Sequence, residues 1–116
     1  MGTKLLFVYG TLKRGHKNHH LIADQVFRGA AVTEARYRLV DLGPYPGLIR
    51  DDDKGLSVKG EVWAVSPKRL AELDDFEGEA YSREPVALVE VDEGVEAYFW
   101  MLRVPPFVPG GAVWPF

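Results

Sequence analysis

The sequence contains no cysteine, which excludes disulfide bonds, thiolate nucleophiles and thiolate metal sites. No apolar run approaches the roughly 18 residues that a membrane span needs, and the short apolar N-terminal stretch is not followed by a small-residue cleavage site. The chain also lacks an excess of basic residues. Its net charge of −3 argues against general nucleic-acid binding. We therefore expect a cytoplasmic protein that binds neither nucleic acid nor a membrane.

The remaining composition is that of an ordinary globular protein. Of 116 residues, 47% are hydrophobic and 27% are charged, which predicts one compact domain with its own core. We assign residues 1–104 to this domain. Residues 105–116 contain four prolines and three aromatic residues, so we expect an irregular tail that drapes over the same domain and buries its aromatic side chains.

Hydrophobic patterning predicts the main elements. Lys4–Tyr9 is continuously apolar after its lysine, as in a strand that is buried on both faces. Apolar and polar residues alternate in four later segments, which predicts further strands. Turn residues separate several of these segments, including a three-residue hairpin loop at Asp92–Gly94. The four predicted strands are Ala30–Val40, Val58–Val65, Tyr81–Val91 and Val95–Val104.

The clearest helix signal begins at Ser66, a good N-cap that is followed by Pro67 at the first helical position. Leu70, Leu73 and Phe76 recur at helical spacing, and Gly78 can end the helix. A second, shorter helix is expected within His19–Phe27. Together the elements predict an α+β domain, in which a mixed and mostly antiparallel sheet curls into a small β-barrel with short flanking helices.

Two local patterns suggest sites that the sequence does not complete. Gly10–Lys17 resembles a phosphate-binding loop, but its lysine is out of register and no hydroxyl follows, so we do not expect nucleotide binding. Its backbone N–H groups suit a carboxylate or an oxyanion, although an ordinary turn explains the glycines equally well. His16 and His20 have a spacing that zinc can use. A solvated helix start is the simpler interpretation, and we expect no metal.

An acidic cluster, Asp74–Glu79, lies where the main helix should end. A solvated helix end is one interpretation. However, the helix dipole and the neighbouring carboxylates both disfavour negative charge there, so they should raise a carboxyl pKa towards the range of a general base. Glu77 is the best candidate because Phe76 and Gly78 can give it one apolar wall and an open backbone.

Two further residue groups admit either a structural or a functional interpretation. The rigid segment Gly43–Gly47 is a turn or a pocket wall, with Pro44 and Tyr45 as the contacting residues. Tyr81 and Arg83 share one face of their strand shortly after Glu77, and each either contacts a ligand or lies on the strand surface.

At this point the chain resembles the γ-glutamylcyclotransferase-like family. The resemblance rests on Phe7–Leu12 (FVYGTL), continued by Lys13–Gly15, and on Leu73–Gly78 (LDDFEG), followed by Tyr81–Arg83. Gly43–Gly47 and Lys59–Val62 also correspond to family segments. The resemblance implies the family's small barrel fold, substrate binding through the backbone of Tyr9, Gly10, Thr11 and Leu12, and Glu77 as the catalytic acid/base.

The implied reaction is the cyclisation of a γ-glutamyl amine or γ-glutamyl amino acid, which releases 5-oxoproline and a free amine. It needs no metal or organic cofactor, because the substrate supplies its own amino nucleophile. We add Pro44, Tyr45, Tyr81 and Arg83 as substrate-binding candidates. The alternative is a non-catalytic module that binds a small metabolite in the same pocket. The sequence leaves open the leaving amine and the choice between a monomer and a homodimer.

Overall fold

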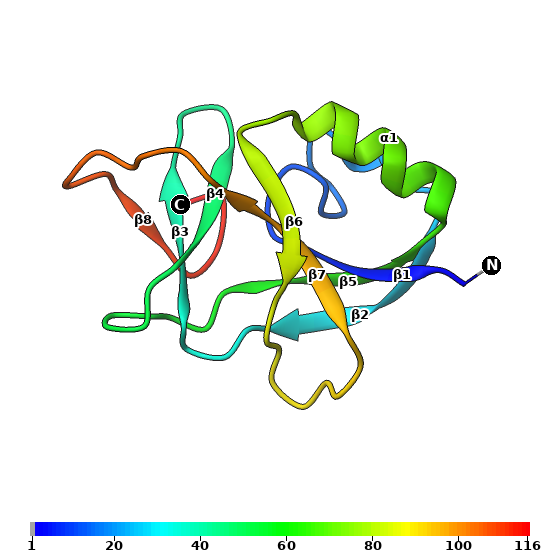
Figure 1. Ribbon diagram of the computed structural model, residues 1–116, viewed down its shortest axis with the longest axis horizontal. Coiled ribbons are helices and arrows are strands. Elements are labelled where there is room, and N and C mark those ends of the chain that lie inside the picture. The colour runs from blue at the N-terminus through cyan, green and yellow to red at the C-terminus, as the bar shows by residue number, and fades with distance from the viewer. Residues whose placement is uncertain (1) are drawn as a thin grey trace.

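Strand β1 (Lys4–Val8) lies inside an eight-stranded mixed sheet, in a computed structural model that describes residues 2–116 (Figure 1). It pairs antiparallel with β5 and parallel with β7. The strand order is β2-β5-β1-β7-β4-β3-β8, and β6 pairs with β7 beside this path. The other strands are β2 (Val26–Val32), β3 (Tyr37–Asp41), β4 (Pro46–Arg50), β5 (Lys59–Val65), β6 (Tyr81–Pro85), β7 (Val95–Trp100) and β8 (Gly110–Gly111).

The sheet curls into a half-barrel, which confirms the predicted α+β class with a mixed, mostly antiparallel sheet. Successive β1 side chains point to opposite faces and enter two different cores. Phe7 belongs to the core inside the curl, whereas Leu6 and Val8 belong to the core beneath the helix. Both faces of β1 are therefore buried, as its continuous apolar run predicts.

The α-helix α1 (Pro67–Glu77) covers the second core with Leu70 and Leu73 (Figure 1). Ser66 is its N-cap and accepts a hydrogen bond from the Arg69 amide at 3.2 Å. Gly78 ends it with φ +78°, a conformation that favours glycine. The predicted bounds and caps of this helix are confirmed.

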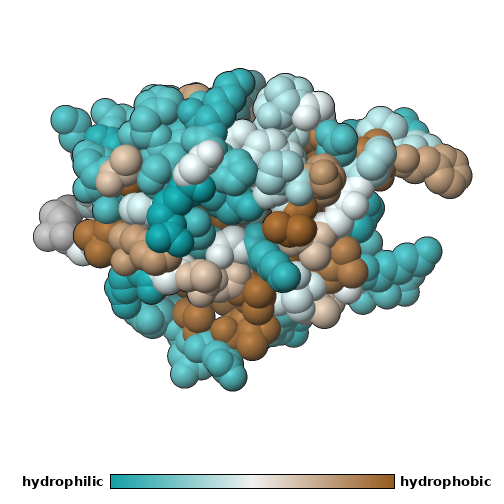
Figure 2. Space-filling model, turned by 180° about the vertical axis from the view of Figure 1, so that it is seen from behind, coloured by the Kyte–Doolittle hydropathy of each residue, from teal (hydrophilic) through white to brown (hydrophobic). Residues whose placement is uncertain are grey.

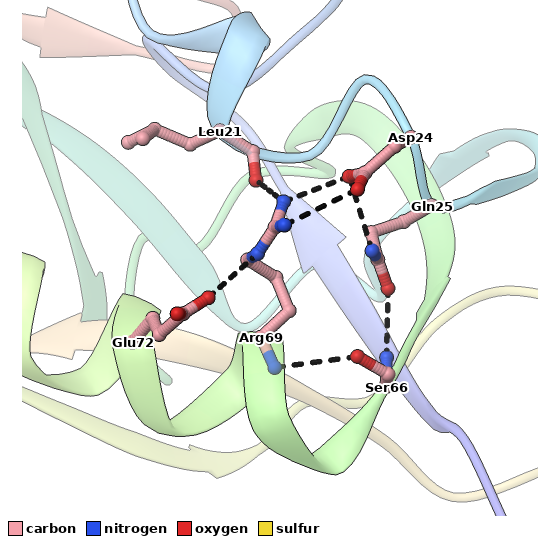
Figure 3. Close-up of polar contacts among 6 residues, drawn as sticks. All are labelled: Leu21, Asp24, Gln25, Ser66, Arg69 and Glu72. Carbon is pink, nitrogen blue, oxygen red and sulfur yellow. Dashed lines mark hydrogen bonds and ion pairs between the residues drawn. The ribbon is translucent and has the colours of Figure 1, made fainter.

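A polar network attaches the first half of α1 to the segment that precedes β2 (Figure 3). Arg69 grips the Asp24 carboxylate with two guanidinium nitrogens at 2.7 and 3.2 Å, and it also bonds to Glu72 at 2.8 Å. Gln25 accepts a hydrogen bond from the Ser66 amide at 2.8 Å. Apolar packing thus holds the buried face of α1 on the sheet, and charge-assisted hydrogen bonds hold its N-terminal half.

The prediction of a helix within His19–Phe27 is wrong, because the structure has only one 3₁₀ turn there, His19–Leu21. Val26 and Phe27 instead begin β2, where they pair with Ala64 and Trp63 of β5. Strand pairing therefore overrides the weak helical pattern. Val26 is 58% exposed on β2.

Three predicted strands are shorter than expected, because β2 and β3 divide Ala30–Val40, β6 ends at Pro85 and β7 ends at Trp100. The segment Ala30–Val40 is interrupted between β2 and β3, where the Arg36 amide bonds back to the Glu34 carbonyl at 2.8 Å. The three-residue hairpin loop at Asp92–Gly94 is also wrong. β6 ends at Pro85 and β7 begins at Val95, so a longer loop joins them. Proline lacks the N–H that a continuing ladder needs.

The C-terminal segment contains the short strand β8, which pairs with β3 although no regular element was expected there. The Lys59 amide then bonds to the Ala112 carbonyl at 2.8 Å, which brings the segment after β8 back to the start of β5. Trp114 packs on the inner core, whereas Phe107 is fully exposed and Phe116 is half exposed. The division of the chain after residue 104 stays a prediction.

The surface around α1 is hydrophilic on the back of the molecule, and apolar side chains gather below it (Figure 2). Val26 and Phe27 of β2 are among the large apolar residues that remain exposed. Within residues 2–116, the structure has no helix that combines the length and the hydropathy of a membrane span.

Replacement of the N-cap should weaken α1 without affecting the sheet. We expect Ser66→Ala to lower the free energy of unfolding by about 1 kcal/mol, because the Arg69 amide loses its acceptor. Urea unfolding monitored by circular dichroism measures this. Ser57→Ala, in an exposed segment between strands, is the matched control and should change stability by less than about 0.5 kcal/mol. Equal effects of the two substitutions would contradict the capping role.

Candidate active site

A cavity of about 200 Å³ lies where β1, its following loop, the end of α1 and strands β4, β6 and β7 converge. Seven of the nine residues predicted for the site line it, although the segments that carry them are far apart in the sequence. These residues are Tyr9, Gly10, Thr11, Leu12, Tyr45, Glu77 and Tyr81.

The loop after β1 turns back sharply and leaves its first amides unpaired. The Lys13 amide bonds to the Gly10 carbonyl at 3.1 Å, and the Asn18 amide bonds to the Thr11 carbonyl at 2.9 Å. Within residues 2–116, the amides of Thr11 and Leu12 have no hydrogen-bond acceptor. Unpaired amides at a cavity wall can bind a carboxylate or a developing oxyanion.

Gly10 is needed here because another strand packs against it. A Cβ at this position would lie 2.8 Å from the Pro46 ring of β4, closer than van der Waals contact allows. The Pro46 carbonyl in turn accepts a hydrogen bond from the Tyr81 hydroxyl at 2.9 Å. Gly10, Pro46 and Tyr81 thus join the loop to β4 and β6 at the cavity wall.

The same loop is attached to the body of the protein at two further points. Glu61 of β5 accepts hydrogen bonds from the Arg14 amide and from the Trp63 indole, both at 3.1 Å. On the other side, the Lys13 ammonium donates to the Trp114 carbonyl, and the His16 ring lies 5.2 Å from the Trp114 ring. Residues from the middle and the end of the chain therefore fix a loop near its start.

Glu77 is half-buried at the last residue of α1 and lines the cavity. Among residues 2–116, its carboxyl group has no hydrogen-bond or ion-pair partner. Burial raises the pKa of Glu77 from an ordinary 4.5 to about 7. The predicted direction is confirmed. The cause differs, because desolvation produces the shift rather than the helix dipole or the neighbouring carboxylates.

The groups that face Glu77 from the sheet are phenols. Tyr9 of β1's end, Tyr81 of β6 and Tyr98 of β7 each interact electrostatically with its carboxylate. Burial is the main cause that raises the pKa of each phenol above its ordinary value, so all three stay neutral at physiological pH. Glu77 is therefore the group in this cavity that can exchange protons near pH 7.

An aromatic wall completes the cavity. The Tyr81 ring lies 6.3 Å from Tyr45 and 5.2 Å from Trp100. The Trp100 indole nitrogen is buried and has no hydrogen-bond partner among the residues that the structure describes. Tyr9 donates its hydroxyl to the Tyr98 carbonyl at 2.6 Å, which holds the base of the cavity together.

Two of the predicted residues do not line the cavity. Pro44 lies in the exposed turn before Tyr45. Arg83 points its guanidinium at Asp74 and Glu96 instead. Sequence reasoning missed several lining residues, namely Asn18, Pro46, Phe76, Tyr98 and Trp100. The alternation of β7 carried a usable signal, because Tyr98 and Trp100 are two residues apart and so share a face.

The two histidines that suggested a zinc site differ in their surroundings. The His16 ring lies 5.2 Å from the Trp114 ring, whereas His20 is exposed. Within the described part of the chain, no group of three or more histidines and carboxylates is arranged to hold a metal ion.

The ionisation of Glu77 can be measured directly. Carbon-detected NMR of the carboxyl groups should show one that titrates near pH 7, and Glu77→Gln should remove that signal. A midpoint near 4.5 would contradict the burial of this group.

The same shift predicts a change of stability with pH. Between about pH 4.5 and 7 the folded protein keeps a proton on Glu77 that the unfolded chain has released. The contribution of Glu77 to the free energy of unfolding therefore falls as the pH rises through this window and is constant above it. Glu77→Gln should be more stable than the wild type above pH 7, by up to about 3 kcal/mol. The difference should shrink towards pH 4.5, and a difference that is independent of pH would contradict the prediction.

A family model described as "Gamma-glutamyl cyclotransferase, AIG2-like" matches residues 6–112, which include the whole of this cavity. Proteins from Rattus norvegicus and Homo sapiens, both named gamma-glutamylaminecyclotransferase, are 44% identical over 80 residues. These matches cover 63% of this chain and 54% and 52% of the relatives. The chain thus spans about half the length of the curated relatives it matches.

The crystal structure of an AIG2-like protein from Mus musculus has the same fold. It superimposes with a TM-score of 0.85 at 30% identity, over 98% of this chain and 89% of that one. The family model and this solved structure agree on nearly the full length of the domain. The chain belongs to the gamma-glutamyl cyclotransferase, AIG2-like family.

Proposed function

We propose that this domain cyclises a γ-glutamyl compound to 5-oxoproline and releases the attached amine, with Glu77 as the acid/base. The observation that carries the proposal is one half-buried carboxyl group with a pKa of about 7, in the same small cavity as unpaired backbone amides. The names of the rat and human relatives point to the same reaction class.

The reaction needs no protein nucleophile. The α-amino group of the glutamyl unit attacks its own γ-carbonyl carbon, which closes a five-membered ring. Holding the two ends together gives the large rate advantage of an intramolecular process. The carbonyl oxygen becomes an oxyanion during the attack, and the amides of Thr11 and Leu12 are the donors we assign to it.

Proton transfer is the part that a side chain must supply. An α-ammonium carries three protons and the product lactam nitrogen carries one, so two protons leave. The departing amine gains both and leaves as an ammonium when the γ-carbon–nitrogen bond breaks. A carboxyl group with a pKa of about 7 can accept and return these protons in turn, because neither of its forms is strongly favoured near neutral pH.

We further propose that the leaving group is an amine without a carboxylate beside the cleaved bond. In the part of the chain that the structure describes, neither a lysine nor an arginine lines the cavity. A γ-glutamyl amino acid would bring a second carboxylate next to Glu77 without a partner for its charge, whereas a γ-glutamyl amine would not. The aromatic wall of Tyr45, Tyr81 and Trp100 suits an alkyl chain or a cation.

The reaction itself is tested with purified protein and a panel of γ-glutamyl amines and amino acids, by mass spectrometry of released 5-oxoproline. We expect Glu77→Gln to lower kcat at least about 100-fold while keeping the fold. The kcat/KM of the wild type should rise with pH through a midpoint near 7, because the ionised carboxylate must accept the first proton. Full activity of Glu77→Gln would remove this residue from the mechanism.

Leaving-group preference is measured on the same panel. We expect a γ-glutamyl alkylamine to exceed the γ-glutamyl amino acid of matched carbon chain in kcat/KM by about tenfold or more. The matched pair differs only in the second carboxylate, so the reverse order would contradict the charge argument. If ligands raise the melting temperature without product release, the domain is a binding module instead.

A further inference from the structure

Helix α1 carries Glu77 at its last residue, yet its apolar anchors lie earlier. The residues of α1 that are buried are Leu70 and Leu73. Phe76, the next apolar residue, is 49% exposed and lines the cavity mouth instead of the core. Apolar packing therefore fixes the first two turns of α1 and does not fix the last one.

Polar contacts of Asp74 hold that last turn. The Arg83 guanidinium of β6 donates to both Asp74 oxygens, at 2.9 and 3.0 Å. The Tyr98 hydroxyl of β7 donates to the same carboxylate at 2.7 Å. Asp74 lies one turn before Glu77, and its carbonyl accepts the Gly78 amide at 3.1 Å. Hydrogen bonds from strands β6 and β7 thus hold the helix turn that ends at Glu77.

Arg83 forms ion pairs with two carboxylates, Asp74 and Glu96. Its remaining nitrogen donates to Glu96 of β7, and Glu96 also lies 3.6 Å from the Lys4 ammonium. Two carboxylates therefore share this guanidinium, so its charge is matched within the protein. Hydrogen bonding by Arg83 also holds the pKa of Asp74 below its ordinary value, which keeps the carboxylate ionised.

We propose that the Asp74–Arg83 ion pair positions Glu77 over the cavity by fixing the last turn of α1 to β6 and β7. This inference rests on the proposed function of Glu77. It assigns to Arg83 a positioning role behind the helix in place of the expected contact with substrate. A bidentate pair is suited to this because its planar fork fixes orientation as well as distance.

The helix offers a matched control. The pair Asp24–Arg69 is also bidentate, through Nη1 and Nη2 of Arg69, and it attaches the other half of α1 (Figure 3). Loss of either pair should loosen the helix, but only Asp74–Arg83 lies next to the acid/base. Asp24→Asn therefore separates general destabilisation of α1 from displacement of Glu77.

We expect Asp74→Asn and Arg83→Met each to lower kcat about 10–100-fold with little change in KM, since misplacing a reacting group by about 1 Å has this effect. Asp24→Asn should stay within about twofold of the wild type. Arg83→Lys keeps the charge without the fork and should recover only part of the loss. The double variant Asp74→Asn/Arg83→Met should lose no more than either single variant.

The pH dependence distinguishes positioning from a simple effect of charge. The acids of its own helix lie near Glu77. Among the described residues of the sheet, the titratable groups that face it are the neutral phenols of Tyr9, Tyr81 and Tyr98. If the ion pair positions Glu77, both substitutions release it towards solvent and lower the midpoint of its titration. If the pair acts through charge alone, removing the carboxylate and removing the guanidinium shift the midpoint in opposite directions, which would overturn the proposal.

Two measurements hold even if no substrate is turned over. NMR titration of Glu77 gives the midpoint without catalysis, and hydrogen exchange reports the Gly78 amide that closes the last turn. Suppose that no turnover is detected. Positioning is then still supported if the Gly78 amide exchanges faster in Asp74→Asn than in Asp24→Asn and the midpoint of the Glu77 titration is lower in Asp74→Asn than in the wild type. Unchanged exchange and midpoint in Asp74→Asn overturn the proposal, whatever the activity.

Discussion

The pairing of β1 between β5 and β7 is the constraint on which the rest of the structure depends. Because β1 is buried on both faces, it must have a core on each side of the sheet. Helix α1 covers the core on one face of β1, and the curled sheet encloses the core on the other face. The chain leaves β1 at Gly10, where the two cores meet the cavity, so the strand that organises the fold also delivers the loop of the candidate site.

The candidate site combines a desolvated carboxyl group, that of Glu77, with uncharged neighbouring side chains. Among residues 2–116, no lysine, arginine or histidine lines the cavity, and burial keeps the Tyr9 and Tyr81 phenols neutral. Under these conditions desolvation alone is enough to bring a carboxyl pKa to about 7. The charged residues nearby, Asp74 and Arg83, neutralise each other behind the helix. The ion pair of Asp74 and Arg83 thus contributes to structure, while the Glu77 carboxyl group has no ion-pair partner among residues 2–116.

Local signals in the sequence were sufficient for β1 and for α1 with its caps, and seven of the nine residues expected at the site line the cavity. They failed where a distant partner decides the outcome. Val26 and Phe27 join β5 instead of a helix because Ala64 and Trp63 offer a ladder edge. Arg83 was expected at the ligand because neither its strand nor its spacing reveals that Asp74, nine residues earlier, reaches it from the helix. The raised pKa of Glu77 was foreseen for a local reason, whereas tertiary burial causes it.

The attachment of the Gly10–Gly15 loop to Trp114 has a consequence for the order in which the protein is completed during synthesis. Lys13 and the Trp114 carbonyl that it contacts are 101 positions apart. At about 5–20 residues per second, a ribosome adds that length in about 5–20 s. During this time β5 and then β7 are added to the growing chain, and the segment around Trp114 that steadies the loop is made last. The earliest part of the candidate site to be synthesised is therefore among the last to reach its final geometry, and the nascent apolar strand must stay free of other chains until then.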